Sequence, residues 1–101
     1  MIRVLVMYPR TEGKRFDLDY YRDHHMPLVK ERLAPIKVEI DLGFSGGGDL
    51  PAPYHAVSHM TFASREELAS RYAAAAEELN KDKEKFTDVE IIRQISEVLE
   101  V

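Results

Sequence analysis

Both alternating sets of residues are largely apolar in the first strand-like segment, residues 2–8, which Pro9 ends. A strand that is apolar on both faces is typical of the middle of a sheet that is covered on both sides. Residues 36–44 instead alternate strictly between apolar and polar side chains, as expected of a half-buried edge strand. The pattern therefore predicts a sheet whose central strands are covered on both faces.

Asp17 marks the start of the first helix, because its carboxylate can accept hydrogen bonds from the free N–H groups of the first turn. Phe16 and Tyr21 are spaced to form a hydrophobic staple around that start. Pro27 removes a helix hydrogen bond and disfavours α geometry at the residue before it, so we expect a break or kink there. The predicted inward stripe consists of Leu18, Tyr21, His25, Leu28, Val29 and Arg32.

The second half of the chain predicts two more strands and one more helix. Residues 54–62 form the third strand and residues 89–98 the fourth. Ser64 and Glu67 form a capping-box pattern at the start of the second helix, which should end near Leu79. Residues 80–85 are charged and turn-like, and the alternative is that they add one short helical turn. The buried stripe of this helix is expected to comprise Leu68, Tyr72, Ala75, Ala76 and Leu79.

The element order is therefore β-α-β-β-α-β, within one domain that spans residues 1–101. Right-handed crossovers arrange this order as an α+β, ferredoxin-like fold, with a four-stranded antiparallel sheet, both helices on one face, and strands one and three in the centre. Two helices cover only one face, yet the first, third and fourth strands carry apolar residues on both. We therefore expect a homodimer that packs sheet to sheet; the alternative is that scattered Val and Ile side chains simply stay exposed.

The composition restricts the classes of partner that the protein is expected to bind. Nucleic acids and anionic membranes require a concentrated basic surface, so neither is expected for a chain of net charge -4. No apolar run approaches the ~20 residues of a membrane span, and residues 1–8 lack a secretory pattern. The chain has no cysteine and hence no disulfide framework, which suits a cytoplasmic location.

Residues 16–29, FDLDYYRDHHMPLV, resemble the signature of the EthD-like family: an aromatic residue, a polar cap, a Tyr-Tyr pair and then His-Met-Pro-Leu-Val. Residues 54–57 and 60–64 are also similar to the family. The resemblance implies a dimeric α+β barrel, in which two ferredoxin-like sheets face each other with the helices outside. Structurally similar barrels include cofactor-independent oxygenases, isomerases and dehydratases of aromatic or polyketide-like substrates, and the family's namesake accompanies an oxygenase system that degrades a fuel ether.

His25 is the first candidate catalytic residue, because it lies on the inward stripe and matches the histidine of the family signature. Tyr21 lies one turn earlier on the same face, so its phenol can orient the imidazole or a substrate. A histidine beside a phenol in an apolar cavity can act as a general acid or base near neutral pH. The alternative is a structural histidine whose ring nitrogens are satisfied within the core.

Tyr54, His59, Phe44 and Tyr72 are the predicted ligand contacts, because aromatic side chains can line a pocket for an apolar ring. Ordinary core packing is the alternative for each of them. A metal site is not expected: the two adjacent histidines of the first helix diverge by about 100°, and no carboxylate completes a set. No motif implies a cofactor.

Two functions follow as hypotheses. In the first, the protein is a cofactor-independent enzyme that binds a small hydrophobic or aromatic molecule, with His25 transferring protons in an isomerisation, a dehydration or an oxygenation. In the second, it is a non-catalytic dimeric binding or accessory protein of an oxygenase or degradation pathway. An enclosed pocket with His25 partly exposed and hydrogen-bonded favours the enzyme, whereas a filled core around a sealed His25 favours the accessory protein.

Overall fold

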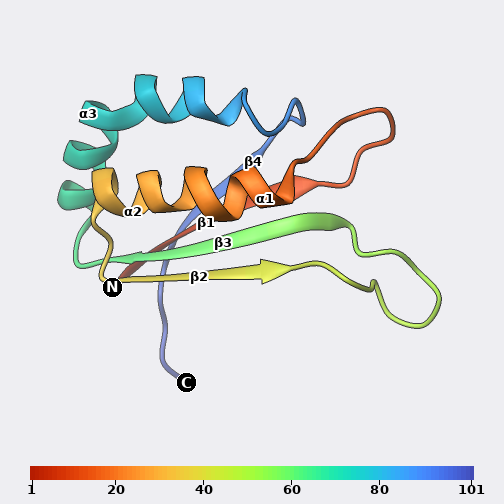
Figure 1. Cartoon of the computed structure of the whole chain (residues 1–101). Coiled ribbons are helices and arrows are strands. Elements are labelled where there is room, and N and C mark those ends of the chain that lie inside the picture. Colours follow the sequence, from red (N-terminus) through yellow and green to blue (C-terminus); the bar gives the residue numbers. More distant parts are fainter.

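The computed structural model describes all residues, 1–101, and its sheet has four strands. The strands run in the order β2-β3-β1-β4, and each neighbouring pair is antiparallel. The first and third strands are therefore central, as predicted, and the helices lie together on one face of the sheet (Figure 1). The strands are β1 (Ile2–Pro9), β2 (Lys37–Leu42), β3 (Tyr54–Phe62) and β4 (Ile92–Glu97).

The first helical segment is continuous but changes its hydrogen-bond spacing along its length (Figure 1). A short turn, α1 (Leu18–Tyr20), passes into a π-helix, η1 (Tyr21–His25), and then into α2 (Met26–Leu33). The N–H of Met26 donates to the carbonyl of Tyr21, five residues back instead of four. Both the Asp17 cap and the contact between Phe16 and Tyr21 are confirmed, the two rings lying 5.3 Å apart.

Pro27 does not break this helix, and the expectation of a break was wrong. Pro27 lies in the first turn of α2, directly after the π-turn, and Met26 before it keeps helical angles of φ -65° and ψ -38°. The π-turn also changes which side chains point inward. Met26 and Leu33 are buried, whereas Leu18 and Arg32 of the predicted stripe are exposed.

The second long helix, α3 (Arg65–Lys83), begins at the predicted cap: the Ser64 hydroxyl accepts a hydrogen bond from the Glu67 N–H at 3.2 Å. It continues past Leu79 to Lys83, so the extra helical turn, which was predicted only as the alternative, is present. Contacts with the first helix hold this last turn, because Asp82 is buried there and accepts hydrogen bonds from it.

The core lies between the helices and the inner face of the sheet, where alternate residues of β1 and β3 are buried. On the outer face, Met7 of β1 lies between Val57 of β3 and Ile92 of β4. No element of the chain covers this face (Figure 1). None of the helices combines the length and the apolar character needed to cross a bilayer.

Candidate functional site

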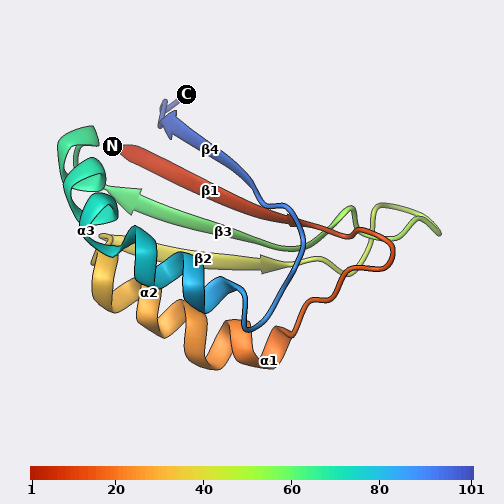
Figure 2. The same cartoon turned by 90° about the horizontal axis from the view of Figure 1, so that it is seen from above.

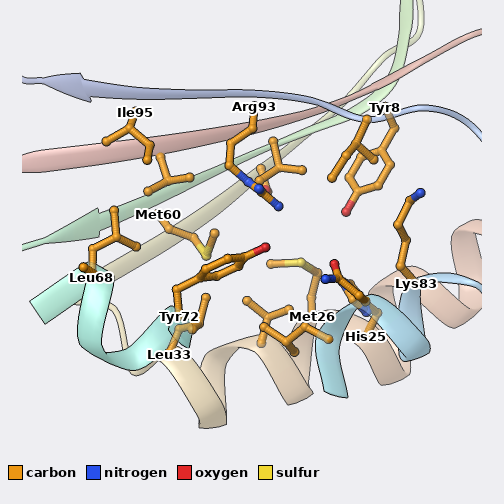
Figure 3. Close-up of a pocket in the computed structure, with 18 of the residues that line it drawn as sticks. Tyr8, His25, Met26, Leu33, Met60, Leu68, Tyr72, Lys83, Arg93 and Ile95 are labelled. Carbon is orange, nitrogen blue, oxygen red and sulfur yellow. The ribbon is translucent and has the colours of Figure 1, made fainter. Parts of the chain in front are cut away.

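A cavity of about 360 Å³ lies between the helices and the inner face of the sheet (Figure 3). Pockets for small organic molecules typically span roughly 300–1,000 Å³, so this cavity has the size of a ligand site. The helices lie toward β2 and β3, and they leave the β4 side of the sheet open (Figure 2). The apolar part of the wall includes Val4, Val6, Met26, Val29, Leu33, Met60, Leu68, Leu79, Ile91 and Ile95.

His25 is buried in the wall of this cavity and is hydrogen-bonded to Asp82. The His25 Nδ1 lies 2.8 Å from one carboxylate oxygen, and the other oxygen accepts a hydrogen bond from the Tyr20 hydroxyl at 2.7 Å. Neither partner is predicted from the sequence, because the pattern ends the helix before Asp82 and places Tyr20 off the inward stripe. Continuation of the helix beyond Leu79 is the one local signal that would have placed Asp82 on a buried face.

The protonation states of this pair follow from their surroundings. Burial lowers the pKa of His25 below its usual 6.5, and the hydrogen bond and charge of Asp82 oppose that shift. Burial alone would raise the pKa of Asp82, but hydrogen bonds from Tyr20 and His25, with the charges of His25 and Lys85, lower it. Near pH 7, therefore, Asp82 is a carboxylate and His25 is a neutral imidazole.

This arrangement determines which nitrogen of His25 faces a ligand. A carboxylate can only accept hydrogen bonds, so the Nδ1 of His25 carries the proton and donates it to Asp82. The Nε2 atom is then unprotonated. It has no hydrogen-bond partner in the protein, and it is not sealed from solvent. A molecule in the cavity therefore meets His25 through a free, basic nitrogen.

Phe86 packs against the imidazole ring of His25. Its ring is fully buried and lies 4.5 Å from the imidazole and 5.4 Å from the Tyr21 ring. The carbonyl of Phe86 accepts a hydrogen bond from the Asp17 N–H at 2.7 Å, which ties the chain after α3 to the start of the first helix. Because this tie draws the end of α3 against the first helix, it brings Asp82 within reach of His25.

Two of the six predicted site residues line the cavity, namely His25 and Tyr72. The guanidinium carbon of Arg93 lies 5.0 Å from the centre of the Tyr72 ring. Tyr21 does not line the cavity; it is fully buried next to His25, with the two rings 6.2 Å apart. Burial raises the pKa of the Tyr21 phenol and nearby Ser58 opposes that rise, but the hydroxyl makes no hydrogen bond of normal geometry.

The other three predicted ligand contacts lie away from the cavity. His59 is on the outer face of the sheet, where its Nε2 lies 2.7 Å from an oxygen of Asp41. Phe44 follows the end of β2 and is 96% exposed, because strand pairing stops at Leu42. Tyr54 is half-buried at the start of β3. No three His, Cys, Asp or Glu side chains lie together as a metal site would require.

The two adjacent tyrosines should respond differently to loss of their hydroxyl groups. Tyr21→Phe removes a buried hydroxyl that has no partner, so the free energy of unfolding should stay constant or rise by about 1 kcal/mol. Tyr20→Phe removes the hydrogen bond to Asp82 and should lower the free energy of unfolding. Urea unfolding of the two variants measures this contrast, and a greater loss in Tyr21→Phe than in Tyr20→Phe would contradict it.

Acidification should lower the free energy of unfolding through the same pair. The folded-state pKa values of His25 and Asp82 both lie below their usual values of 6.5 and 3.8, so the unfolded chain binds more protons in these ranges. The contribution of His25 is complete above about pH 6.5 and is lost as the pH falls through its folded-state pKa. Urea unfolding between about pH 8 and pH 5 should show this slope. In His25→Gln the slope should be smaller, because only the contribution of His55, whose pKa is also lowered, should remain.

Comparisons with known proteins give a consistent result. The family model described as "EthD domain" matches residues 12–90. The crystal structure of an EthD-like protein from Ralstonia eutropha JMP134 is 38% identical, with a TM-score of 0.91, over 97% of this chain and 91% of that chain. No curated protein is a significant match.

Two more distant structures share the fold. An ethyl tert-butyl ether D (EthD) family protein from Bacillus halodurans C-125 is 17% identical, with a TM-score of 0.78, over 98% of this chain and 99% of that chain. A DABB family protein from Mesorhizobium loti, described as having a ferredoxin-like fold, is 16% identical, with a TM-score of 0.59, over 98% and 97% of the two chains. Together with the strand order, these matches confirm the predicted ferredoxin-like α+β fold.

Proposed function

Because the chain belongs to the EthD family, we propose that it binds a small apolar or aromatic molecule in the cavity and that His25 transfers a proton on that molecule. The observation that carries the proposal is the free Nε2 of His25 at the wall of an apolar cavity, with Nδ1 held by a buried carboxylate. Family membership itself supports the fold and leaves the activity open.

The proposed step is removal of a proton from a carbon beside a carbonyl group. Nε2 of His25 accepts the proton, and the electron pair of the broken C–H bond moves onto the carbonyl oxygen as an enolate. The Asp82 carboxylate stabilises the imidazolium that forms. Return of the proton to a different carbon completes an isomerisation, and its transfer to a departing hydroxyl group, released as water, completes a dehydration.

The environment of His25 suits a base more than a structural histidine. Its lowered pKa keeps the imidazole neutral at pH 7, and Asp82 holds the tautomer in which Nε2 is free. Asp82 and Tyr20 act as positioning residues, because neither lines the cavity. Together, the neutral imidazole and the free Nε2 support the enzymatic hypothesis over the accessory one.

The experiment that tests the proposal is hydrogen–deuterium exchange of 2-tetralone, an enolisable bicyclic ketone. Proton NMR in D₂O follows the loss of the signals from the carbon atoms beside the carbonyl. The folded protein should accelerate the exchange above the rate in buffer, and Met26→Trp, which fills the cavity, should not. Binding of the ketone without accelerated exchange would exclude the base role and favour the accessory function.

We further propose that two copies pack through the outer faces of their sheets. Support comes from Met7, Val57 and Ile92, which form an apolar row that nothing in the chain covers, Ile92 being 46% exposed. Burial of such a row stabilises association by roughly 25 cal/mol per Å² of apolar surface.

Val57→Glu should therefore convert a dimer into a monomer, because a charge at the centre of the interface would be buried without a partner. Sedimentation velocity over a range of concentrations measures the change. Ala73→Glu, which adds the same charge on the exposed side of α3, is the matched control and should stay dimeric. A wild-type chain that sediments as a monomer at high concentration would refute the proposed interface.

A further inference from the structure

All fully charged side chains that line the cavity are cationic, although the whole chain has a net charge of -4. They are Arg65, Lys83 and Arg93, and no Asp or Glu is part of the wall. None of the three forms an ion pair with an acidic side chain, whereas Arg22, Arg32 and Arg71 do. The cavity therefore offers positive charge that the protein itself leaves without a counter-charge.

One of these cations lies at the His25 end of the cavity, and a second reaches into its middle. Figure 3 shows Lys83, His25 and Tyr8 close together, with Arg93 reaching from β4 into the space beside them. Burial raises the pKa of Tyr8, and the charge of Arg93 opposes that rise, so these two side chains are within electrostatic reach. Leu33, Met60 and Leu68 lie toward the other end (Figure 3).

The position of Arg93 on β4 explains why its charge faces the cavity. Arg93 pairs with Val6 of β1, whose side chain points to the inner face, and inward-facing residues alternate along a strand. Its neighbours on that face are Ile91 and Ile95, which also line the cavity. This guanidinium is set into an apolar row, next to the Tyr72 ring, and it is well placed to receive an anion.

We propose that the ligand of this cavity is an organic acid, with its apolar body against Leu33, Met60 and Leu68 and its ionised group between Lys83 and Arg93. This inference rests on the proposed function, because it names the class of molecule on which His25 acts. The planar fork of Arg93 matches a carboxylate, and Lys83 adds a second, mobile charge. The same two cations would stabilise the negative oxygen that forms when His25 removes a proton.

The test compares 2-naphthoate with 2-naphthamide, a neutral probe of nearly the same shape. Isothermal titration calorimetry at pH 7 should give an affinity for 2-naphthoate at least about 10-fold higher, the effect expected of a charge-assisted hydrogen bond. Arg93→Gln and Lys83→Gln should each lower the affinity for 2-naphthoate and leave that for 2-naphthamide unchanged. The preference should also weaken as salt is added.

Two charge-matched controls accompany these variants. Arg65→Gln removes a cation that also lines the cavity but lies at the opposite end of α3 from Lys83. Lys81→Gln removes an exposed cation of the same helix that pairs with Glu77 at 3.2 Å and does not line the cavity. Neither control should change the ratio of the two affinities.

Each alternative outcome overturns a defined part of the argument. Equal affinities in the wild type, or a preference that survives both Arg93→Gln and Lys83→Gln, would overturn the organic-acid proposal and leave proton transfer by His25 standing. If the wild-type protein bound neither probe, that result would also overturn the organic-acid proposal. A normal preference for 2-naphthoate, combined with no accelerated exchange of 2-tetralone, would instead support the anion site and refute the proposed reaction.

Discussion

His25→Gln is expected to reduce the catalysed exchange of 2-tetralone by about 10²- to 10⁴-fold, which is the usual contribution of a general acid or base. Glutamine preserves much of the length of the side chain and can still donate a hydrogen bond to the Asp82 carboxylate, so the fold should be retained. It has no nitrogen that accepts a proton near pH 7. The NMR exchange assay therefore isolates the chemical role of Nε2.

The adjacent histidine provides the control. His24 is exposed, does not line the cavity and makes no hydrogen bond to Asp82, so His24→Gln should exchange 2-tetralone at the wild-type rate. A His25→Gln protein with full activity would show that another group is the base. Ligand affinity should change little in either variant if the loss lies in the proton transfer step.

Asp82→Asn separates positioning from chemistry in the same assay. The asparagine oxygen can still accept a hydrogen bond from Nδ1, but loss of the negative charge removes the charge effect that opposes the burial shift, so the pKa of His25 should fall further. The acid limb of the pH–rate profile should then move to lower pH while the maximum rate decreases. A variant that is merely less stable would lose rate without moving the acid limb, and that result would exclude the positioning role.

Phe86→Ala is expected to lower the free energy of unfolding by about 3–5 kcal/mol, the usual cost of deleting a fully buried ring. The ring lies at the centre of an aromatic cluster, 5.7 Å from both Tyr8 and Phe16 and 4.5 Å from His25. Such contacts add to the burial energy, and the cavity left by alanine is bordered by helices and a central strand that cannot easily close it.

Urea unfolding with Phe86→Leu as the reference variant measures this effect. Leucine keeps most of the apolar volume, so its loss should be clearly smaller than that of alanine. The His25 ring resonances should also shift in the alanine variant, because Phe86 packs against that ring. A loss below about 1 kcal/mol in Phe86→Ala would mean that the cluster does not hold the two helices together.

The fold was largely predictable from short-range patterns. The third strand has the predicted bounds, and the Asp17 and Ser64 caps bind backbone N–H groups as expected. The order of the elements and the right-handed crossover rule were enough to place strands one and three in the centre of the sheet. The edge strands β2 and β4 were predicted too long, because regular pairing covers only Lys37–Leu42 and Ile92–Glu97.

The candidate site was predictable only in part. The inward stripe and the resemblance to the EthD-like signature both pointed to His25, and helical spacing pointed to Tyr72. Phe44 was expected on the apolar face of the second strand because of its alternating pattern, but the strand pairing stops at Leu42. The π-turn at Tyr21–His25 changed the face on which later residues lie, so Met26 in the cavity wall was missed.

The sequence by itself determined where strands and helices form and how they are ordered, because alternation, helical periodicity and end caps act between residues that are close in the chain. Only the tertiary structure decided that Asp82 and Phe86 meet His25, which is 57 residues away from Asp82. The physical reason is that this contact depends on how two helices dock on one sheet face. The hydrogen bonds and buried rings that stabilise the docking leave no periodic pattern in either segment.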